Sequence, residues 1–107
     1  DYNTPYGKII NKILLLYGNS MNKNNLLTLK SYAYNIIRYD LSINLFYKNL
    51  LVVFLNKESM RDKTKIKLIK YFADSEYNYN NSYRSIIIIE SLLIYCYNIY
   101  NLSPRYD

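Results

Sequence analysis

The side chains that enzymes use most often for catalysis are scarce in this chain. It contains no His, a single Cys (Cys96) and two Gly (Gly7 and Gly18). A Cys/His zinc site, a Ser-His-Asp triad and a Cys-His pair therefore cannot be assembled from its residues alone. Two glycines also provide neither a phosphate-binding loop nor a dinucleotide-binding fingerprint. We expect no catalytic residue, no metal site and no cofactor, so an enzyme acting alone is the least favoured class.

Three further groups could carry chemistry. Asp74 and Glu76 are two residues apart, so on a helix they diverge and cannot form a catalytic acid pair. Cys96 has apolar and aromatic neighbours, which favours a buried, unreactive thiol. Glu90 interrupts the most apolar segment of the chain. It must either face solvent or meet a cation at the rim of an interface, from Arg84 or from a partner chain.

The chain is basic, with a net charge of +6, and six of its fourteen Lys and Arg residues lie within residues 57–70. Lys63, Lys67 and Lys70 follow the i, i+4, i+7 spacing of one helix face. These lysines could neutralise nucleic-acid phosphates, although a solvated helix face is the favoured interpretation. The 15 tyrosines could likewise stack on bases, but their spacing beside Ile and Leu favours core or interface positions.

Apolar residues recur at helical spacing in five segments. The expected helices run from Pro5 to Tyr17, from Asn25 to Tyr39, from a cap at Asp40 or Ser42 to about residue 55, from a cap at Asp62 to about Tyr77, and from about Tyr83 to Asn101. The expected inward positions are Ile9, Ile10, Ile13, Leu14 and Tyr17, then Leu26, Leu29, Ala33, Ile36 and Ile37, then Ile43, Phe46, Leu50, Val53 and Phe54, and then Ile66, Ile69, Phe72 and Ala73.

The run Ile86–Ile89 is ambiguous, because four β-branched residues favour a strand. A lone strand would have no partner, however, and the segment continues as an apolar run long enough for a helix. We therefore predict an all-α single domain of five helices without a sheet. Residues 85–104 could span a bilayer by length, but Glu90 lies inside them, so we expect no membrane segment.

Two segments near the end of the chain resemble a known family. Residues 70–77, Lys-Tyr-Phe-Ala-Asp-Ser-Glu-Tyr, precede a polar break and then Ile-Ile-Ile-Ile-Glu-Ser-Leu-Leu at residues 86–93. This order resembles the end of replication factor C small subunits, the clamp-loader family. Thr4-Pro5 with the following isoleucines, residues 26–40, and Leu41-Ser42-Ile43 with Leu50-Leu51-Val52 resemble the preceding helices, so the resemblance covers nearly all of the chain. Asn78 stands where the family usually has Arg, and Ser82 or its neighbours replace the usual Gly.

The resemblance implies a C-terminal helical collar domain, residues 1–107, cut from a longer chain. In clamp loaders the collar holds the ATPase subunits in a ring, so the implied partners are other loader subunits, with the sliding clamp and primed DNA reached through the complex. The implied location is the nucleus or a site of viral or organellar replication. A basic nucleic-acid-binding module and an unrelated helical interaction domain remain the alternatives.

The last predicted helix is apolar around most of its circumference, so one side should remain exposed after the other packs on the core. We therefore expect it to form the subunit interface. The residues assigned to this interface are Ile86, Ile87, Ile89, Glu90, Leu93, Ile94, Tyr97 and Tyr100.

Overall fold

A computed structural model describes residues 5–38, 42–56, 60–83 and 85–101. Within these ranges the chain forms five α-helices and no strand. The helices are α1 (Pro5–Tyr17), α2 (Lys23–Arg38), α3 (Ile43–Leu55), α4 (Asp62–Asn80) and α5 (Ser85–Tyr100). The predicted all-helical single domain is confirmed, and Ile86–Ile89 belong to a helix.

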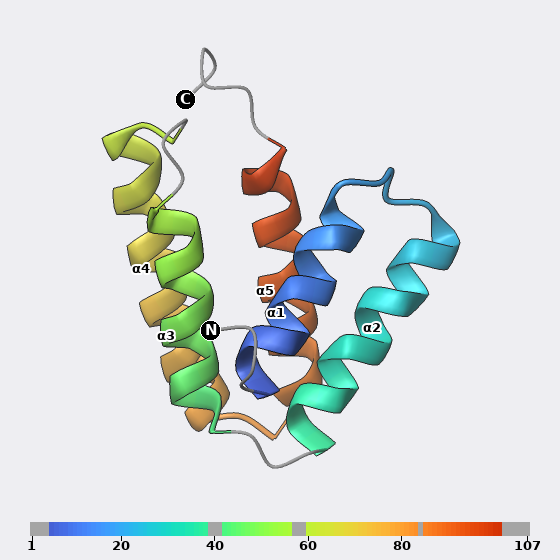
Figure 1. The fold of residues 1–107 in the computed structure, drawn as a ribbon. Coiled ribbons are helices and arrows are strands. Elements are labelled where there is room, and N and C mark those ends of the chain that lie inside the picture. Colours follow the sequence, from blue (N-terminus) through green and yellow to red (C-terminus); the bar gives the residue numbers. More distant parts are fainter. Residues whose placement is uncertain (1–4, 39–41, 57–59, 84, 102–107) are drawn as a thin grey trace.

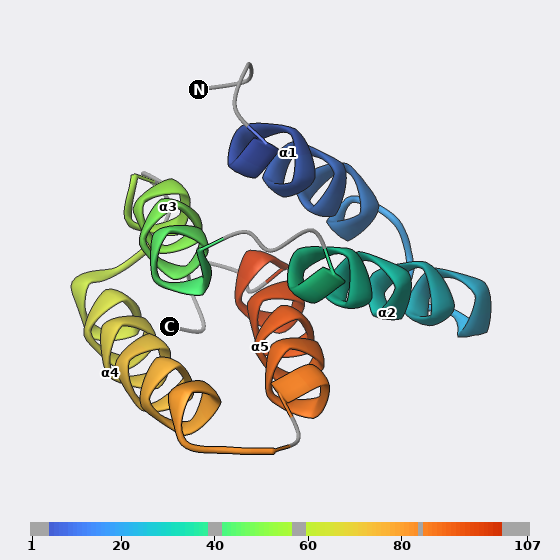
Figure 2. The ribbon, with the colours of Figure 1, turned by 90° about the horizontal axis from the view of Figure 1, so that it is seen from below.

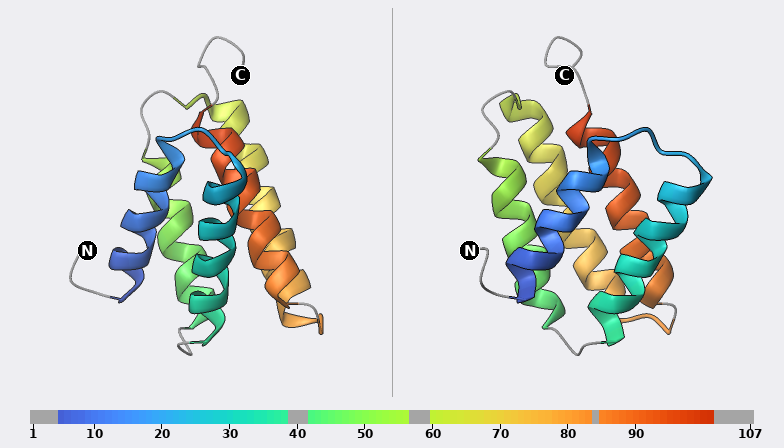
Figure 3. Two further views of the ribbon diagram at one scale, coloured as in Figure 1. Left: turned by 90° about the vertical axis from the view of Figure 1, so that its right-hand side faces the viewer. Right: turned by 45° about the vertical axis from the view of Figure 1, so that its right-hand side comes forward.

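Successive helices run in opposite directions (Figures 1 and 3). Their main contacts follow a closed order, from α1 to α2, α5, α4, α3 and back to α1. Figure 2 shows the result from below, with α5 between α2 and α4. This order gives α5 an inner side toward the core and an outer side framed by α2 and α4.

Polar residues near the amino ends of α2 and α4 account for where these helices begin. The Asn22 side-chain oxygen accepts a hydrogen bond from the Asn25 backbone N–H at 2.9 Å. This asparagine cap allows α2 to begin at Lys23, two residues before the predicted start. Helix α4 is capped at Arg61, so Asp62 is its first residue rather than its cap, and its carboxylate suits the positive end of the helix dipole. The proposed cap at Asp40 lies outside the described residues.

The core is built from apolar side chains of all five helices. It consists of Ile10, Ile13, Leu16, Tyr17, Leu29, Ala33, Ile36, Phe46, Tyr47, Leu50, Phe54, Met60, Leu68, Phe72, Ile89, Leu92, Leu93 and Cys96. Leu26 and Val53, both predicted inward, are exposed at 42% and 37%. Most of the predicted stripes in α1, α2 and α3 nevertheless contribute to this core.

The predicted inward face of α4 is wrong. Ile66, Ile69 and Ala73 are exposed, and of the predicted set only Phe72 is buried. The inner side of α4 instead consists of Thr64, Leu68, Phe72 and Ser75. Ser75 can be buried because its hydroxyl lies 2.7 Å from the Tyr47 hydroxyl of α3, which satisfies both polar groups.

Tyr17 joins α1 to α5. Its hydroxyl donates a hydrogen bond to the Leu93 carbonyl oxygen, and its ring contacts the rings of Tyr97 and Tyr100, each with a centroid separation of 5.7 Å. The Asn101 amide donates in turn to the Tyr17 carbonyl oxygen at 3.3 Å. These bonds fix the register of α5 against α1.

Replacing Tyr47 by Phe should lower the free energy of unfolding by about 1–3 kcal/mol, because the buried Ser75 hydroxyl loses its partner. The double variant Tyr47→Phe/Ser75→Ala should cost less than the sum of the two single variants. Urea unfolding followed by circular dichroism measures all three. Strictly additive losses would mean that the two hydroxyls do not stabilise each other.

The buried tyrosines should make the domain sensitive to alkali. Desolvation by burial, the largest cause, raises the pKa of Tyr47 to about 12 and the pKa of Tyr17 well above its ordinary value. In the unfolded chain both phenols have a pKa of about 10. Their contribution to stability is therefore complete below that pH, and it is lost as the pH rises toward the folded-state pKa of Tyr47. The urea midpoint should fall across this window, and a flat midpoint would contradict the burial of these phenols.

Candidate functional site

Helix α5 has one buried side and one exposed side. Its fully buried residues are Ile89, Leu92, Leu93 and Cys96. On the opposite side Ile87 and Ile94 are 49% and 41% exposed, and Ser91 and Asn98 are exposed between and beyond them. Because these positions are three or four residues apart, they form one outward ridge.

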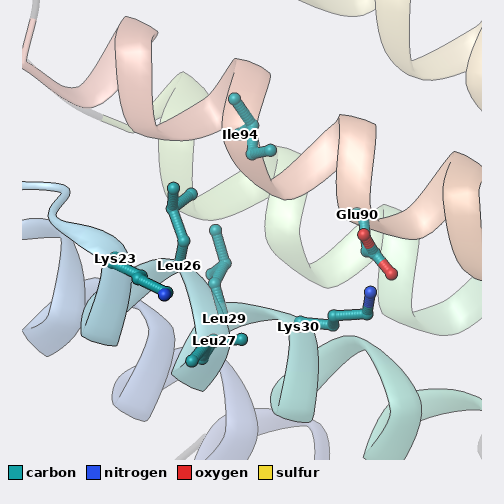
Figure 4. Close-up of a pocket in the computed structure, with 7 residues that line it drawn as sticks. All are labelled: Lys23, Leu26, Leu27, Leu29, Lys30, Glu90 and Ile94. Carbon is teal, nitrogen blue, oxygen red and sulfur yellow. The ribbon is translucent and has the colours of Figure 1, made fainter.

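A groove lies between this ridge and α2. It has a volume of about 280 Å³, and the end of α2 near Lys23 leans away from α5, which opens it (Figures 1 and 3). Leu26 and Leu29 point from α2 toward α5, and the Lys30 ammonium points toward the Glu90 carboxylate (Figure 4). The groove is lined by Lys23, Leu26, Leu27, Leu29, Lys30, Glu90 and Ile94.

Glu90 is half-buried in this groove. The sequence predicted that this acid would either face solvent or meet a cation. The cation beside it comes from α2, as Lys30, and Arg84 lies outside the described residues. The groove therefore combines an apolar floor with both signs of charge, and its two lysines outnumber its one acid.

A second groove lies between the ridge and α4, with a volume of about 240 Å³. On its wall the rings of Tyr71 and Tyr95 are stacked, with centroids 3.8 Å apart and planes 5° from parallel. The exposed Asp74 is the charged residue that lines this groove. The lining residues are Tyr71, Asp74, Ser75, Asn78, Ile87, Ile88 and Ser91.

The ridge of Ile87, Ser91, Ile94 and Asn98, together with the two grooves beside it, forms a surface that we call the α5 face. Figure 2 shows α5 at the middle of this face, flanked by α2 and α4. The α2 flank carries Lys23 and Lys30, and the α4 flank carries Asp74. Two concave, mainly apolar surfaces with charged residues at their edges, on one side of a domain, can hold a protein surface of complementary shape.

The structure divides the eight predicted interface residues between the core and the surface. Ile87 and Ile94 are exposed, whereas Ile86, Glu90, Tyr97 and Tyr100 are half-buried. Ile89 and Leu93 are completely buried in the chain's own core, so their assignment to a subunit interface is corrected. The physical reason is the closed order of helix contacts, which places this side of α5 against the rest of the domain.

The candidate phosphate-facing lysines lie on α4. Lys63, Lys67 and Lys70 are all exposed, as the helical spacing predicted, and none of them lines either groove. The exposed Ile66 and Ile69 lie among them along the same helix. Lys67 and Lys70 nevertheless lie four residues before Tyr71 and Asp74, so they are one helical turn from the groove beside α4.

Features of other kinds of site are missing from the part of the chain that the structure describes. It holds no cluster of three or more His, Cys, Asp or Glu side chains suited to a metal ion. Desolvation by burial raises the pKa of the Cys96 thiol far above its ordinary value, as expected for an unreactive cysteine. None of the helices in the described ranges combines the length and apolar character needed to cross a bilayer.

Comparisons with protein-family models, with curated proteins and with solved structures found no significant match to this chain. The resemblance to replication factor C therefore stays a prediction that rests on the order of residues in the two C-terminal segments and the three that precede them.

Sequence reasoning missed the flanks of the α5 face. Lys23, Lys30 and Leu27 on α2 and Tyr71 on α4 were not assigned to any site, because the sequence does not reveal which helices flank α5. One signal was available in the pair Leu26-Leu27 near the start of α2. Two adjacent leucines point in directions about 100° apart on a helix, so a narrow core-facing stripe cannot include both side chains.

Cys96 should react with a thiol reagent only as fast as the domain unfolds, because the side chain is fully buried and its pKa is raised. The control is Ser31→Cys, at an exposed position of α2, which should react at once. Rapid labelling of Cys96 in the unaltered chain, while the chain remains helical, would contradict the burial of this thiol.

Proposed function

We propose that this chain is an assembly domain that docks its α5 face against a neighbouring helical protein. One observation carries the proposal, the exposure of Ile87 and Ile94 on a helix that is otherwise largely buried or half-buried. Exposed apolar side chains that line grooves are typical of contact surfaces in soluble domains. The domain itself would perform no catalysis.

Within this class, the clamp-loader collar is the assembly that the residues favour most. The two segments that resemble replication factor C small subunits fall within α4 and α5, the last two helices of a five-helix domain. Of the earlier resembling segments, the described residues from Pro5, from 26 to 38, and Ile43 with 50–52 belong to α1, α2 and α3 in the same order. The partners would then be other loader subunits, with the sliding clamp and primed DNA reached through the complex, in the nucleus or at a site of viral or organellar replication.

A nucleic-acid-binding module is the second candidate, and it rests on the exposed row of Lys63, Lys67 and Lys70. The two proposals differ in how they respond to salt. Binding through phosphates weakens steeply as salt rises, because bound counterions are released, whereas apolar docking persists. Retention of partners in high salt therefore favours the α5 face over the lysine row.

Ile87→Asp and Ile94→Asp, introduced separately, should each reduce co-purification of the neighbouring subunits with the tagged chain. Placing a carboxylate in the apolar core of an interface costs about 2 kcal/mol or more, which is roughly a thirtyfold loss of affinity. Mass spectrometry of the purified complex measures the partners, and the proposal expects AAA+ ATPase subunits among them, retained at high salt.

The matched control is Leu15→Asp, because Leu15 is 68% exposed on α1 and lines neither groove. Circular dichroism on each variant separates loss of docking from loss of fold. If both α5 variants fold and retain every subunit, the α5 face is not the docking surface. If the parent chain retains no ATPase subunit, the clamp-loader assignment fails.

A further inference from the structure

We infer that the outer side of α4 docks a partner protein through an amphipathic helix that carries acidic residues beside its apolar stripe. The residues that carry this inference are not those of the α5 face, so it does not depend on the proposed function. Figure 2 shows α4 at the edge of the domain, where its contacts are with α3 and α5. Its inner side packs on the core, and its outer side holds the isoleucines that the sequence wrongly placed inside.

The outer side of α4 carries an apolar stripe. Ile66 and Ile69 are 67% and 46% exposed, and Ala73 and Tyr77 are exposed as well. These four residues are three or four positions apart, so they follow one another along a single face of the helix for about three turns. Such spacing is the pattern by which one helix packs along another. The stripe therefore has the width of one partner helix.

Lysines border this stripe on both edges. Lys63 and Lys70 follow one edge and are exposed, and Lys65 lies half-buried on the other edge. No Asp or Glu occurs between Asp62 and Asp74. Charged residues beside an apolar helical seam decide which partner a helix accepts. These lysines therefore select a partner helix with Asp or Glu at the facing positions.

The same lysines argue against a second copy of this chain. In a parallel pair of α4 helices, Lys65 of one copy would lie opposite Lys70 of the other copy. In an antiparallel pair, the two edges that carry Lys63 and Lys70 would face each other. Facing like charges weaken an interface in both arrangements. The partner is therefore a different protein.

Two other anionic partners fit the stripe less well. Nucleic-acid phosphates could meet the lysines, but they would leave the exposed Ile66 and Ile69 without apolar contacts. An anionic bilayer would bury these isoleucines, yet it would repel Asp74 and Glu76, which follow Lys70 along the helix. A protein helix can place acids opposite the lysines and a neutral or basic residue opposite the two acids. It is the partner that satisfies the whole outer side of α4.

A designed peptide tests the inference, because its charges can be chosen. The probe repeats a heptad with Leu at both core positions and Glu at both flanking positions, and its control has Lys in place of each flanking Glu. Fluorescence anisotropy of the labelled peptides measures their binding to the purified chain. The Glu peptide should bind at least about tenfold more tightly than the Lys peptide. Equal binding of the two peptides, or no binding of the Glu peptide, overturns the inference.

Removal of the apolar stripe separates docking from charge attraction. The variant Ile66→Ser/Ile69→Ser keeps the net charge, and it should bind the Glu peptide at least about tenfold more weakly because the seam loses its apolar contacts. The matched control is Leu15→Ser/Leu45→Ser, since these leucines are 68% and 47% exposed and line neither groove. The control should bind like the parent, and circular dichroism checks that both variants stay helical. Unchanged binding by a folded Ile66→Ser/Ile69→Ser chain overturns the inference.

Charge reversal tests the acidic character of the partner. The variant Lys63→Glu/Lys65→Glu/Lys70→Glu should prefer the Lys peptide, which inverts the order expected for the parent. This measurement keeps the isoleucines in place, so it does not depend on the fold of the serine variant. A reversed chain that still prefers the Glu peptide overturns the choice of an acidic partner.

Competition separates the rival partners. Unlabelled Glu peptide should displace the labelled peptide at a concentration, counted per negative charge, at least about tenfold lower than a single-stranded oligonucleotide or vesicles that contain phosphatidylserine. The opposite order would assign the lysines to nucleic acid or to a bilayer and would overturn the inference. The variant Ile87→Asp should bind the Glu peptide like the parent. Loss of binding in this variant would place the peptide on the α5 face, which refutes this inference and leaves the proposed function standing.

Discussion

Burial of the inner side of α5 is the constraint on which the other helices depend. Ile89, Leu92, Leu93 and Cys96 are completely enclosed, and α2 and α4 both pack directly against this helix. Full burial of a single Leu or Ile side chain contributes about 1.5–3 kcal/mol, which is a large share of the stability of a small domain. Because α5 is apolar on nearly every side, the helices that enclose it leave Ile87 and Ile94 of its outer ridge exposed.

Buried polar groups fix the register of the helices around this apolar core. Apolar contacts alone tolerate sliding, but the Tyr17 hydroxyl must reach the Leu93 carbonyl and the Tyr47 hydroxyl must reach Ser75. In a different register each buried hydroxyl would have no hydrogen-bond partner, and the fold would be less stable. Tyr17 and Tyr47 thus fix the relative positions of neighbouring helices. Such structural roles mean that tyrosines in this chain do not require a base-stacking function.

The sequence was sufficient to predict five helices, their approximate bounds and the unusual character of α5. Helical periodicity carries that information locally. It failed for α4, where Ile66 and Ile69 were expected inside, because the burial of Ser75 depends on Tyr47 in another helix. The flanks of the α5 face were missed for the same reason. Lys30 and Asp74 are far apart in sequence, and only the order of helices brings them to opposite edges of one surface.

The stacked pair of Tyr71 and Tyr95 gives this protein a built-in optical reporter. The chain contains no Trp, so its near-ultraviolet absorption and emission come almost entirely from tyrosine. Two rings held 3.8 Å apart in parallel planes are electronically coupled, and one of them lines the groove beside α4. A partner that settles into this groove changes the solvent around the pair, so its arrival can be followed spectroscopically without any label.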